Sequence, residues 1–119
     1  MKLQISYRLS NNCEGEMRIL LICASGMSTG ILMKKMVQEA SKYTSDFEIK
    51  ACSFQDYEFY GNDFDVILLG PQLSYKLKVI EDNMQIPVGV IPGYDFAIGN
   101  AKAIFKLAEE LISKARGQK

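Results

Sequence analysis

One cysteine, Cys23, stands where an apolar run meets a loop of small and polar residues. The run MRILLIC ends at Cys23, and the loop that follows it, ASGMSTG, is rich in glycine and hydroxyl side chains. A thiolate is a strong nucleophile, and the backbone N–H groups of such a loop favour a bound anion. Phosphate fits this combination best, so the pattern predicts a cysteine that carries a phosphoryl group.

The loop after Cys23 has the composition of a phosphate-binding turn. Its two glycines allow close backbone approach, its three hydroxyl side chains add donors, and a helix predicted from Thr29 adds a favourable dipole. The same dipole favours the thiolate form of Cys23. The loop lacks GxxxxGK[ST] and GxGxxG, so no nucleotide site is predicted. The predicted phosphate-binding residues are Ala24, Ser25, Gly26, Met27, Ser28, Thr29 and Gly30.

The composition limits the remaining chemistry. The 119 residues include no histidine, which excludes Cys-His and Ser-His catalysis, histidine metal sites and a phosphohistidine in this chain. Cys13 and Cys52 form no CxxC pair with each other or with Cys23, so we expect no metal, no cofactor and no disulfide framework. We expect Cys52 to pack within a strand. Equal numbers of basic and acidic residues, 14 of each, argue against a nucleic-acid partner.

A cysteine phosphatase is an alternative. Phosphatases of the low-molecular-weight type carry C-x5-R, in which the arginine clamps the phosphate, but Thr29 stands six residues after Cys23. Asp95 is a candidate for the general acid that such an enzyme needs. The missing arginine favours a carrier, which must surrender its phosphoryl group to the next acceptor.

Apolar periodicity predicts strands that alternate with helices. Continuous apolar runs predict buried parallel strands, and stripes at helical spacing predict amphipathic helices, so the fold class is α/β, with helices on both faces of a parallel sheet. Loops starting at Cys23, Gly70 and Pro92 should then share one rim, beyond the carboxyl ends of the strands. The predicted strands cover 17–23, 47–54, 65–70 and 86–91; the helices start at Thr29, Pro71 and Ala101, and 57–63 is a loop or a short helix.

Residues 1–16 are expected to be an extension of a domain that covers residues 17–119. The extension has two interpretations: a flexible tail, which we favour slightly, or an extra edge strand or exchanged arm. Leu3, Ile5, Tyr7 and Leu9 alternate with polar residues, which is strand periodicity. No run is long enough to span a bilayer and no secretory signal is recognised, so we expect a cytoplasmic protein without direct membrane insertion.

Two stretches carry a resemblance to a known family. LLICASGMSTGIL and LLGPQLSY (Leu68 to Tyr75) resemble the enzyme IIB components of the lactose/cellobiose family of the bacterial sugar phosphotransferase system, from Met17 to about Ala115. Cellobiose-type members typically read C-S-A-G-M-S-T-S. Here Ala24 and Ser25 are exchanged in order, and Gly30 replaces the last serine. Pro92 stands where the family often has an acidic residue.

The resemblance implies a fold, a cycle and partners. The fold is a four-stranded parallel sheet in the order 2-1-3-4, like that of the low-molecular-weight phosphotyrosine phosphatases. A phosphohistidine on a IIA partner would donate its phosphoryl group to Cys23, which would pass it to a sugar held by a membrane IIC partner, such as cellobiose or chitobiose. A regulatory domain of the same fold is a further alternative.

The rim around Cys23 supplies candidate contacts to the partners or the phosphate. Several residues are expected to surround the nucleophile, and some apolar ones are candidates for docking, although for Leu73 we prefer ordinary packing. The rim candidates are Gly70, Pro71, Gln72, Tyr75 and Asp95, and the docking candidates are Met27, Leu73, Tyr75, Tyr94 and Phe96.

Overall fold

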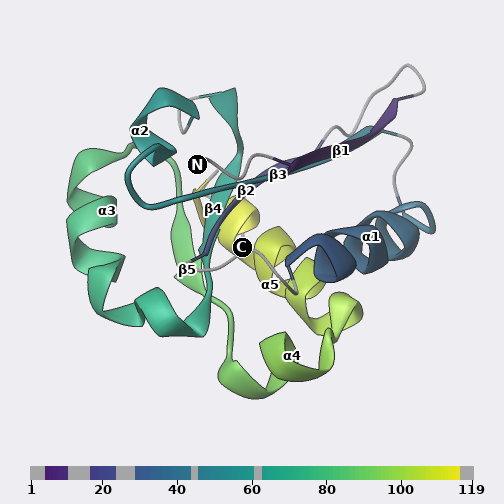
Figure 1. Ribbon diagram of the computed structural model, residues 1–119. Coiled ribbons are helices and arrows are strands. Elements are labelled where there is room, and N and C mark those ends of the chain that lie inside the picture. The colour runs from purple at the N-terminus through teal and green to yellow at the C-terminus, as the bar shows by residue number, and fades with distance from the viewer. Residues whose placement is uncertain (1–4, 11–16, 24–28, 44–45, 61–62, 116–119) are drawn as a thin grey trace.

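A five-stranded sheet forms the centre of the protein, with helices on both faces (Figure 1). The computed structural model describes residues 5–10, 17–23, 29–43, 46–60 and 63–115. The strand order is β1-β3-β2-β4-β5. The strands are β1 (Ile5–Ser10), β2 (Met17–Ile22), β3 (Asp46–Cys52), β4 (Val66–Leu69) and β5 (Val88–Val90).

Strands β2 to β5 are parallel and confirm the predicted order. Counted without β1, the first predicted strand lies between the second and the third, and the fourth lies at the edge. All four residues of β4 are buried, as are the last four of β2. Strands that are covered on both faces need such continuous apolar runs, which explains why sequence alone identifies them.

Strand β1 adds an antiparallel edge strand beside β3. Its six residues pair in register with β3, from Ile5 opposite Ala51 to Ser10 opposite Asp46. Residues 5–10 therefore form an edge strand, which corrects the slightly favoured interpretation of the extension as a flexible tail. Residues 1–4 and 11–16 of the extension, with Cys13, lie outside the described part of the chain.

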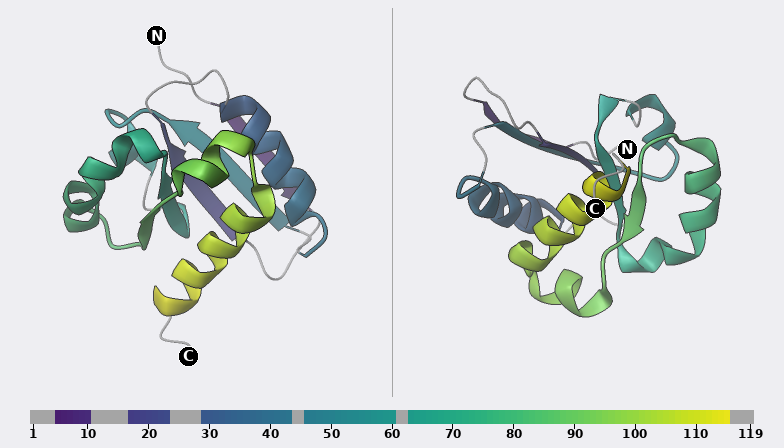
Figure 2. Two further views of the ribbon diagram at one scale, coloured as in Figure 1. Left: turned by 90° about the horizontal axis from the view of Figure 1, so that it is seen from below. Right: turned by 180° about the vertical axis from the view of Figure 1, so that it is seen from behind.

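The helices divide between the two faces of the sheet. Helices α1 and α5 pack on one face, while α2, η2 and α3 cover the other, as the views in Figure 2 show. The helices are α1 (Thr29–Ala40), α2 (Tyr57–Tyr60), the 3-10 helix η2 (Pro71–Lys76), α3 (Leu77–Asn83), α4 (Gly93–Ile98) and α5 (Ala101–Ala115). No helix in the described ranges is long and apolar enough to cross a membrane.

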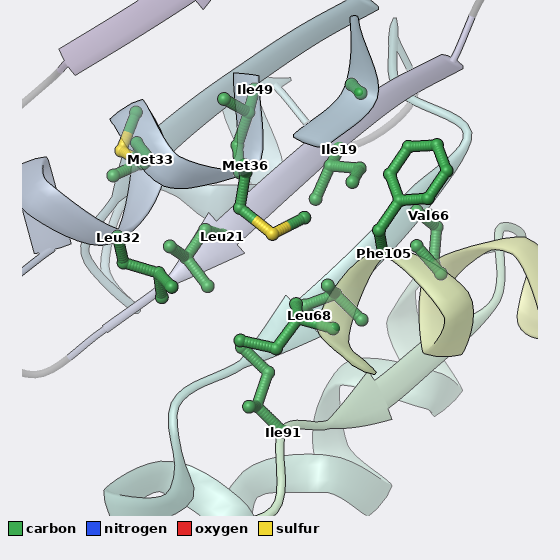
Figure 3. Packing of buried hydrophobic residues seen from close by; sticks show 14 of the residues in the cluster. Ile19, Leu21, Leu32, Met33, Met36, Ile49, Val66, Leu68, Ile91 and Phe105 are labelled. Carbon is green, nitrogen blue, oxygen red and sulfur yellow. The ribbon is translucent and has the colours of Figure 1, made fainter. Parts of the chain in front are cut away.

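The core under α1 and α5 fixes the end of β2 that leads to Cys23. Met33 and Met36 of α1 and Phe105 of α5 meet Ile19 and Leu21 of β2 (Figure 3). Truncating one such buried residue to alanine typically costs about 2–5 kcal/mol of stability, so this layer holds β2 and α1 firmly together.

Several elements differ from the sequence prediction, among them the fourth predicted strand, 86–91, of which only Val88–Val90 form β5. The second predicted strand ends at Cys52 rather than at Phe54, and the segment after Pro71 starts as the 3-10 helix η2 before α3 begins. Helix α4 occupies a region predicted as a loop. It is only six residues long and ends at Gly99, whose φ of 66° is the left-handed conformation that glycine adopts readily.

Candidate functional site

Three backbone hydrogen bonds extend the parallel ladders one residue beyond the strand ends. Each joins an N–H group just past one strand to a carbonyl group of its neighbour. The pairs, with the N–H donor first, are Cys23 to Cys52 at 3.3 Å, Gly70 to Ile22 at 2.9 Å and Ile91 to Leu69 at 2.9 Å. The loops after β2, β4 and β5 therefore start side by side at the carboxyl edge of the sheet, as predicted.

Cys23 lies at this edge with its side chain turned toward α1. It is only 8% exposed and belongs to the apolar cluster that contains Leu32 and Met33. Gly70 is its neighbour across the β2–β4 ladder: a Cβ placed on Gly70 would lie 3.5 Å from the Cys23 Sγ. The Cys23 sulfur therefore packs against the apolar core, and its neighbour on the β4 side of the ladder, Gly70, presents only backbone to it.

The predicted phosphate-binding residues fall into two groups. Ala24, Ser25, Gly26, Met27 and Ser28 lie outside the described residues. Thr29 and Gly30 are the first two residues of α1, so the helix starts at the predicted position. With 12 residues, α1 is long enough for a macrodipole. Its positive end is the N-terminus at Thr29, the end of the helix that is connected to Cys23.

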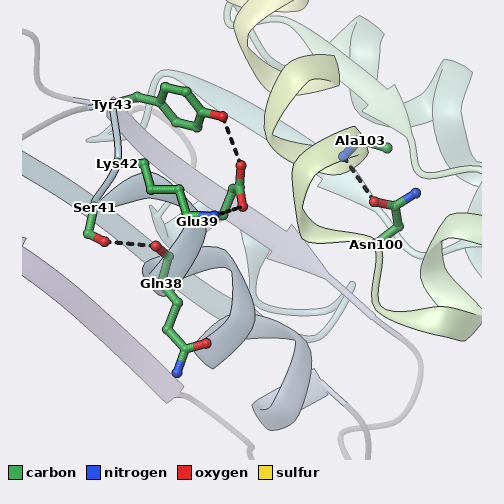
Figure 4. A network of polar contacts seen from close by, with 7 residues as sticks. All are labelled: Gln38, Glu39, Ser41, Lys42, Tyr43, Asn100 and Ala103. Atoms are coloured by element: carbon green, nitrogen blue, oxygen red, sulfur yellow. Dashed lines mark hydrogen bonds and ion pairs between the residues drawn. The ribbon is translucent and has the colours of Figure 1, made fainter.

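The far end of α1 is anchored by a polar and aromatic network. The Glu39 carboxylate accepts a hydrogen bond of 3.0 Å from the Tyr43 hydroxyl and a contact of 3.4 Å from the Lys42 Nζ (Figure 4). The Tyr43 ring stacks on Phe105 of α5, with centroids 5.3 Å apart. The hydrogen bond to Glu39 raises the pKa of Tyr43 above its usual 10.0, because it stabilises the protonated phenol. These contacts fix α1 relative to α5 and hence relative to the site.

The rim residues after β4 form a tight turn beside Cys23. The N–H of Leu73 donates to the Gly70 carbonyl at 2.9 Å, which closes a turn through Pro71 and Gln72. Leu73 itself is buried in the cluster on the other face, so its role is packing. Tyr75 is 73% exposed and available for contact.

The rim residues after β5 divide in the same way. Tyr94 is 73% exposed, whereas Phe96 is half-buried against the core under α1 and α5. The Asp95 carboxylate accepts a hydrogen bond of 3.1 Å from the Asn100 side chain, and its backbone carbonyl accepts another of 2.8 Å from the Asn100 N–H. Asp95 thus closes α4 against the start of α5, and Asn100 in turn caps α5 by accepting from the Ala103 N–H (Figure 4).

Sequence reasoning missed two exposed apolar residues in the helices that follow β2 and β5. Ile31 in the first turn of α1 is 63% exposed, and Ile98 at the end of α4 is 49% exposed. Ile31 had a recognisable signal, because it lies off the buried stripe of Leu32, Met33 and Met36. Ile98 had none, since α4 itself was not predicted.

Cys52 has the packing role that was predicted for it. It is 3% exposed and belongs to the cluster under α2 and α3, on the face opposite Cys23. Burial, with a smaller contribution from Asp56, raises the pKa of the Cys52 thiol from its ordinary 9.0 to about 12. Near neutral pH this thiol is therefore protonated and poorly nucleophilic.

The arginines in the described ranges belong to the opposite end of the sheet. Arg18, the second residue of β2, contacts the Glu48 carboxylate at 3.3 Å and lies over the Phe64 ring. Arg8 of β1 pairs in register with the same Glu48. At about 3.3 Å per strand residue, Arg18 is attached roughly 16 Å from Cys23. Neither arginine is therefore placed like the clamp of a cysteine phosphatase.

Fold and site together define a class. A parallel arrangement of β2 to β5 covered by helices, with a cysteine just past the carboxyl end of the central strand and a helix that starts six residues later, is the architecture of the low-molecular-weight phosphatase fold. The family model for "PTS system, Lactose/Cellobiose specific IIB subunit" matches residues 18–107. The chain belongs to this IIB family, whose members are phosphotransferases of the phosphoenolpyruvate-dependent sugar system.

Curated relatives and a solved structure agree with the family match. The chain is 33% identical over 103 residues to the galactose-specific EIIB component of Lactococcus lactis subsp. cremoris, and equally to the cellobiose-specific EIIB component of Lactococcus lactis subsp. lactis. Each alignment covers 80% of this chain and 95% of the relative. The solution structure of a cellobiose-specific IIB component from Borrelia burgdorferi is similar with a TM-score of 0.70 and 30% identity, over 85% of this chain and 95% of that one.

The family match begins after the extra strand. The family model starts at residue 18, the second residue of β2, so β1 lies outside it. The match does include Cys23, the connection after it, Gly70-Pro71-Gln72 and helix α4.

Proposed function

We propose that this protein is a cytoplasmic phosphoryl carrier in which Cys23 accepts a phosphoryl group and passes it to a sugar. The observation that carries the proposal is the position of Cys23: it directly follows the central β2, borders Gly70 after β4 and precedes a helix that starts at Thr29. Membership in the IIB family supports a phosphotransferase role for the site.

The first half-reaction would phosphorylate Cys23. The Cys23 thiolate attacks the phosphorus of a phosphohistidine on a IIA partner, so that an S–P bond forms and the N–P bond breaks. The bonding electrons return to the imidazole nitrogen of the IIA partner. Main-chain N–H groups of the loop from Ala24 to Gly30, with the hydroxyls of Ser25, Ser28 and Thr29, would hold the phosphoryl oxygens.

The second half-reaction would discharge the cysteine onto the sugar. A hydroxyl oxygen of the sugar, held by a membrane IIC partner, attacks phosphorus, so that an O–P bond forms and the S–P bond breaks. The Cys23 thiolate leaves with the bonding electrons, and the hydroxyl proton passes to a base of the partner or to water. We propose a β-linked disaccharide such as cellobiose or chitobiose, because two of the similar proteins are named cellobiose-specific.

Docking of the IIA and IIC partners would use the apolar side chains around Cys23. Ile31, Tyr75 and Tyr94 follow the carboxyl ends of three adjacent strands, β2, β4 and β5, and each is well exposed. Aromatic side chains are favoured at interfaces, because they bury a large area at a modest entropic cost. Because one nucleophile serves two partners in turn, we expect both to use this same edge.

Reconstituted transfer tests the proposal. Membrane vesicles that hold a matching IIC protein are incubated with phosphoenolpyruvate, the general phosphotransfer proteins, IIA, this protein and a labelled sugar. We expect sugar phosphate only in complete mixtures, and none when Cys23→Ser replaces the wild type. Cellobiose, chitobiose and galactose are compared, and exclusive use of galactose would contradict the disaccharide assignment.

Hydrolysis distinguishes the phosphatase alternative. The structure favours transfer, since the described arginines are attached at the opposite end of the sheet and the Asp95 carboxylate is engaged by Asn100. We expect negligible turnover of an aryl phosphate such as p-nitrophenyl phosphate. Rapid, Cys23-dependent turnover would instead support the phosphatase.

A further inference from the structure

The Gln72 side chain folds back over Gly70, and the Cys23 sulfur borders the same glycine. A Cβ placed on Gly70 would lie 3.0 Å from the Gln72 Oε1 and 3.5 Å from the Cys23 Sγ. The end of the glutamine side chain and the nucleophile therefore border the same small space, which the missing side chain of Gly70 leaves open. The turn closed by the Leu73 N–H on the Gly70 carbonyl brings Gln72 into this position.

Gly70 contributes to this space through its lack of a side chain rather than through its backbone conformation. Its φ of −61° and ψ of 152° are extended values that any residue adopts, and Pro71 favours them in the preceding residue. A methyl group at Gly70 would shift the end of the Gln72 side chain by a few tenths of an ångström, because 3.0 Å is tighter than an ordinary carbon–oxygen contact. The space thus depends on a residue that conformational arguments alone would not require to be glycine.

The chemistry of Gln72 suits an anion beside Cys23. Its side chain is exposed, and among the described residues no hydrogen bond engages its amide. The two ends of an amide exchange by rotation about the last side-chain bond, so Nε2 can replace Oε1 and donate toward the sulfur side. A neutral amide binds phosphate less strongly than an arginine fork does, which suits a group that must be handed on.

We propose that the Gln72 side-chain amide donates a hydrogen bond to the phosphoryl group on Cys23, in a space kept open by Gly70. The inference rests on the proposed function. It assigns to Gln72 a direct contact with the group in transfer, in addition to the loop that follows Cys23. Since the contact forms only when phosphorus is present, loss of the amide should slow transfer without changing the fold.

Three variants test this assignment. Gln72→Ala removes the amide, Gln72→Glu keeps its shape but turns a donor into a negative charge, and Gln38→Glu places the same charge on the exposed third turn of α1. The measurement is the rate of phosphoryl transfer from phosphorylated IIA to each protein, followed by intact mass. Thermal unfolding of each variant, monitored by circular dichroism, checks the fold.

We expect Gln72→Ala to slow transfer roughly tenfold, as loss of a hydrogen bond to a charged group does, and Gln72→Glu to slow it further through repulsion. Gln38→Glu should match the wild type. Alkylation of Cys23 by uncharged iodoacetamide should stay within about twofold in Gln72→Ala, because that reaction involves no phosphoryl group.

The failures are distinguishable. If the wild type accepts no phosphoryl group, the proposed function and this inference both fall. If the wild type is phosphorylated and Gln72→Glu is phosphorylated at the same rate, only the role of Gln72 is overturned. If Gln72→Glu is no slower than Gln72→Ala, the side chain acts by packing rather than by donating to the phosphoryl group, which also overturns the inference.

Discussion

The Cys23 N–H donates a 3.3 Å hydrogen bond to the Cys52 carbonyl, which places the two cysteines on neighbouring strands, β2 and β3. Their side chains nevertheless lie on opposite faces of the sheet, Cys23 in the core under α1 and α5 and Cys52 in the core under α2 and α3. The Cys23 thiol therefore lies at the edge of the sheet that bears the candidate site, whereas the Cys52 thiol is buried in the core on the other face. Proximity of the backbones does not make the two a functional pair.

Oxidation should not join Cys23 to Cys52 in the folded protein. A disulfide requires side chains that point toward each other, with Cβ atoms about 3.5–4.5 Å apart, and these two point away across the sheet. Treatment of Cys13→Ser with diamide, followed by peptide mapping without reduction, should show no Cys23–Cys52 link. A Cys23–Cys52 peptide that forms in the folded protein would show that the strand ends rearrange. A link that forms only after unfolding agrees with the prediction.

The stability of the protein should depend on Cys52 at alkaline pH. The folded state holds the Cys52 proton up to a pKa of about 12, whereas the unfolded state loses it near 9.0. The contribution of the protonated Cys52 thiol to the unfolding free energy is therefore complete below pH 9. It is lost as the pH rises toward 12, at up to about 1.4 kcal/mol per pH unit. Urea unfolding of the wild type and Cys52→Ala from pH 8 to 11 measures the difference.

The Cys52→Ala variant is the control for other groups that titrate in this range, because tyrosines and lysines affect both proteins equally. The wild type should lose more unfolding free energy than Cys52→Ala between pH 9 and 11. Parallel pH profiles would mean that the Cys52 thiolate is accommodated in the folded protein.

Removal of residues 1–16 should uncover the edge of β3. The deletion removes the six residue pairs of the β1–β3 ladder and the contacts of β1 with α1. We expect a loss of about 1–3 kcal/mol in unfolding free energy, together with self-association through the exposed β3 edge. Urea unfolding and size-exclusion chromatography at several concentrations measure both effects.

A deletion of residues 1–4 is the matched control, since it keeps every residue of the β1 ladder. It should retain stability and oligomeric state. If removal of all 16 residues is equally harmless, β1 contributes nothing to the sheet in solution.

The sequence predicted the parallel sheet because its strands are buried on both faces and therefore apolar throughout. β2 and β4 are the strongest examples, and the start of α1 at Thr29 follows from the change to helical spacing. Cys52 was recognised as a packing residue for the same reason. Buried segments must be apolar, so the strands, the start of α1 and the packing of Cys52 could be predicted from the residue types alone.

Other features depend on contacts between distant residues. Helix α4 is too short for a periodic pattern, and its end at Gly99 is a local backbone choice. Pairing of β1 with β3 joins residues some 40 positions apart, and alternation in β1 alone could not choose between a tail and an edge strand. The approach of Gln72 to Cys23 requires the turn after β4 to lie beside the end of β2, which only the assembled sheet provides.

Location of the phosphoryl group tests the central claim most directly. The protein is incubated with phosphoenolpyruvate, the general phosphotransfer proteins and a matching IIA, and is then cleaved and mapped by tandem mass spectrometry at a pH that preserves thiophosphate. We predict a single phosphoryl group on Cys23, which is absent from Cys23→Ser and retained in Cys13→Ser and Cys52→Ala. A phosphoryl group that persists in Cys23→Ser, or that maps to any other residue, would contradict the account.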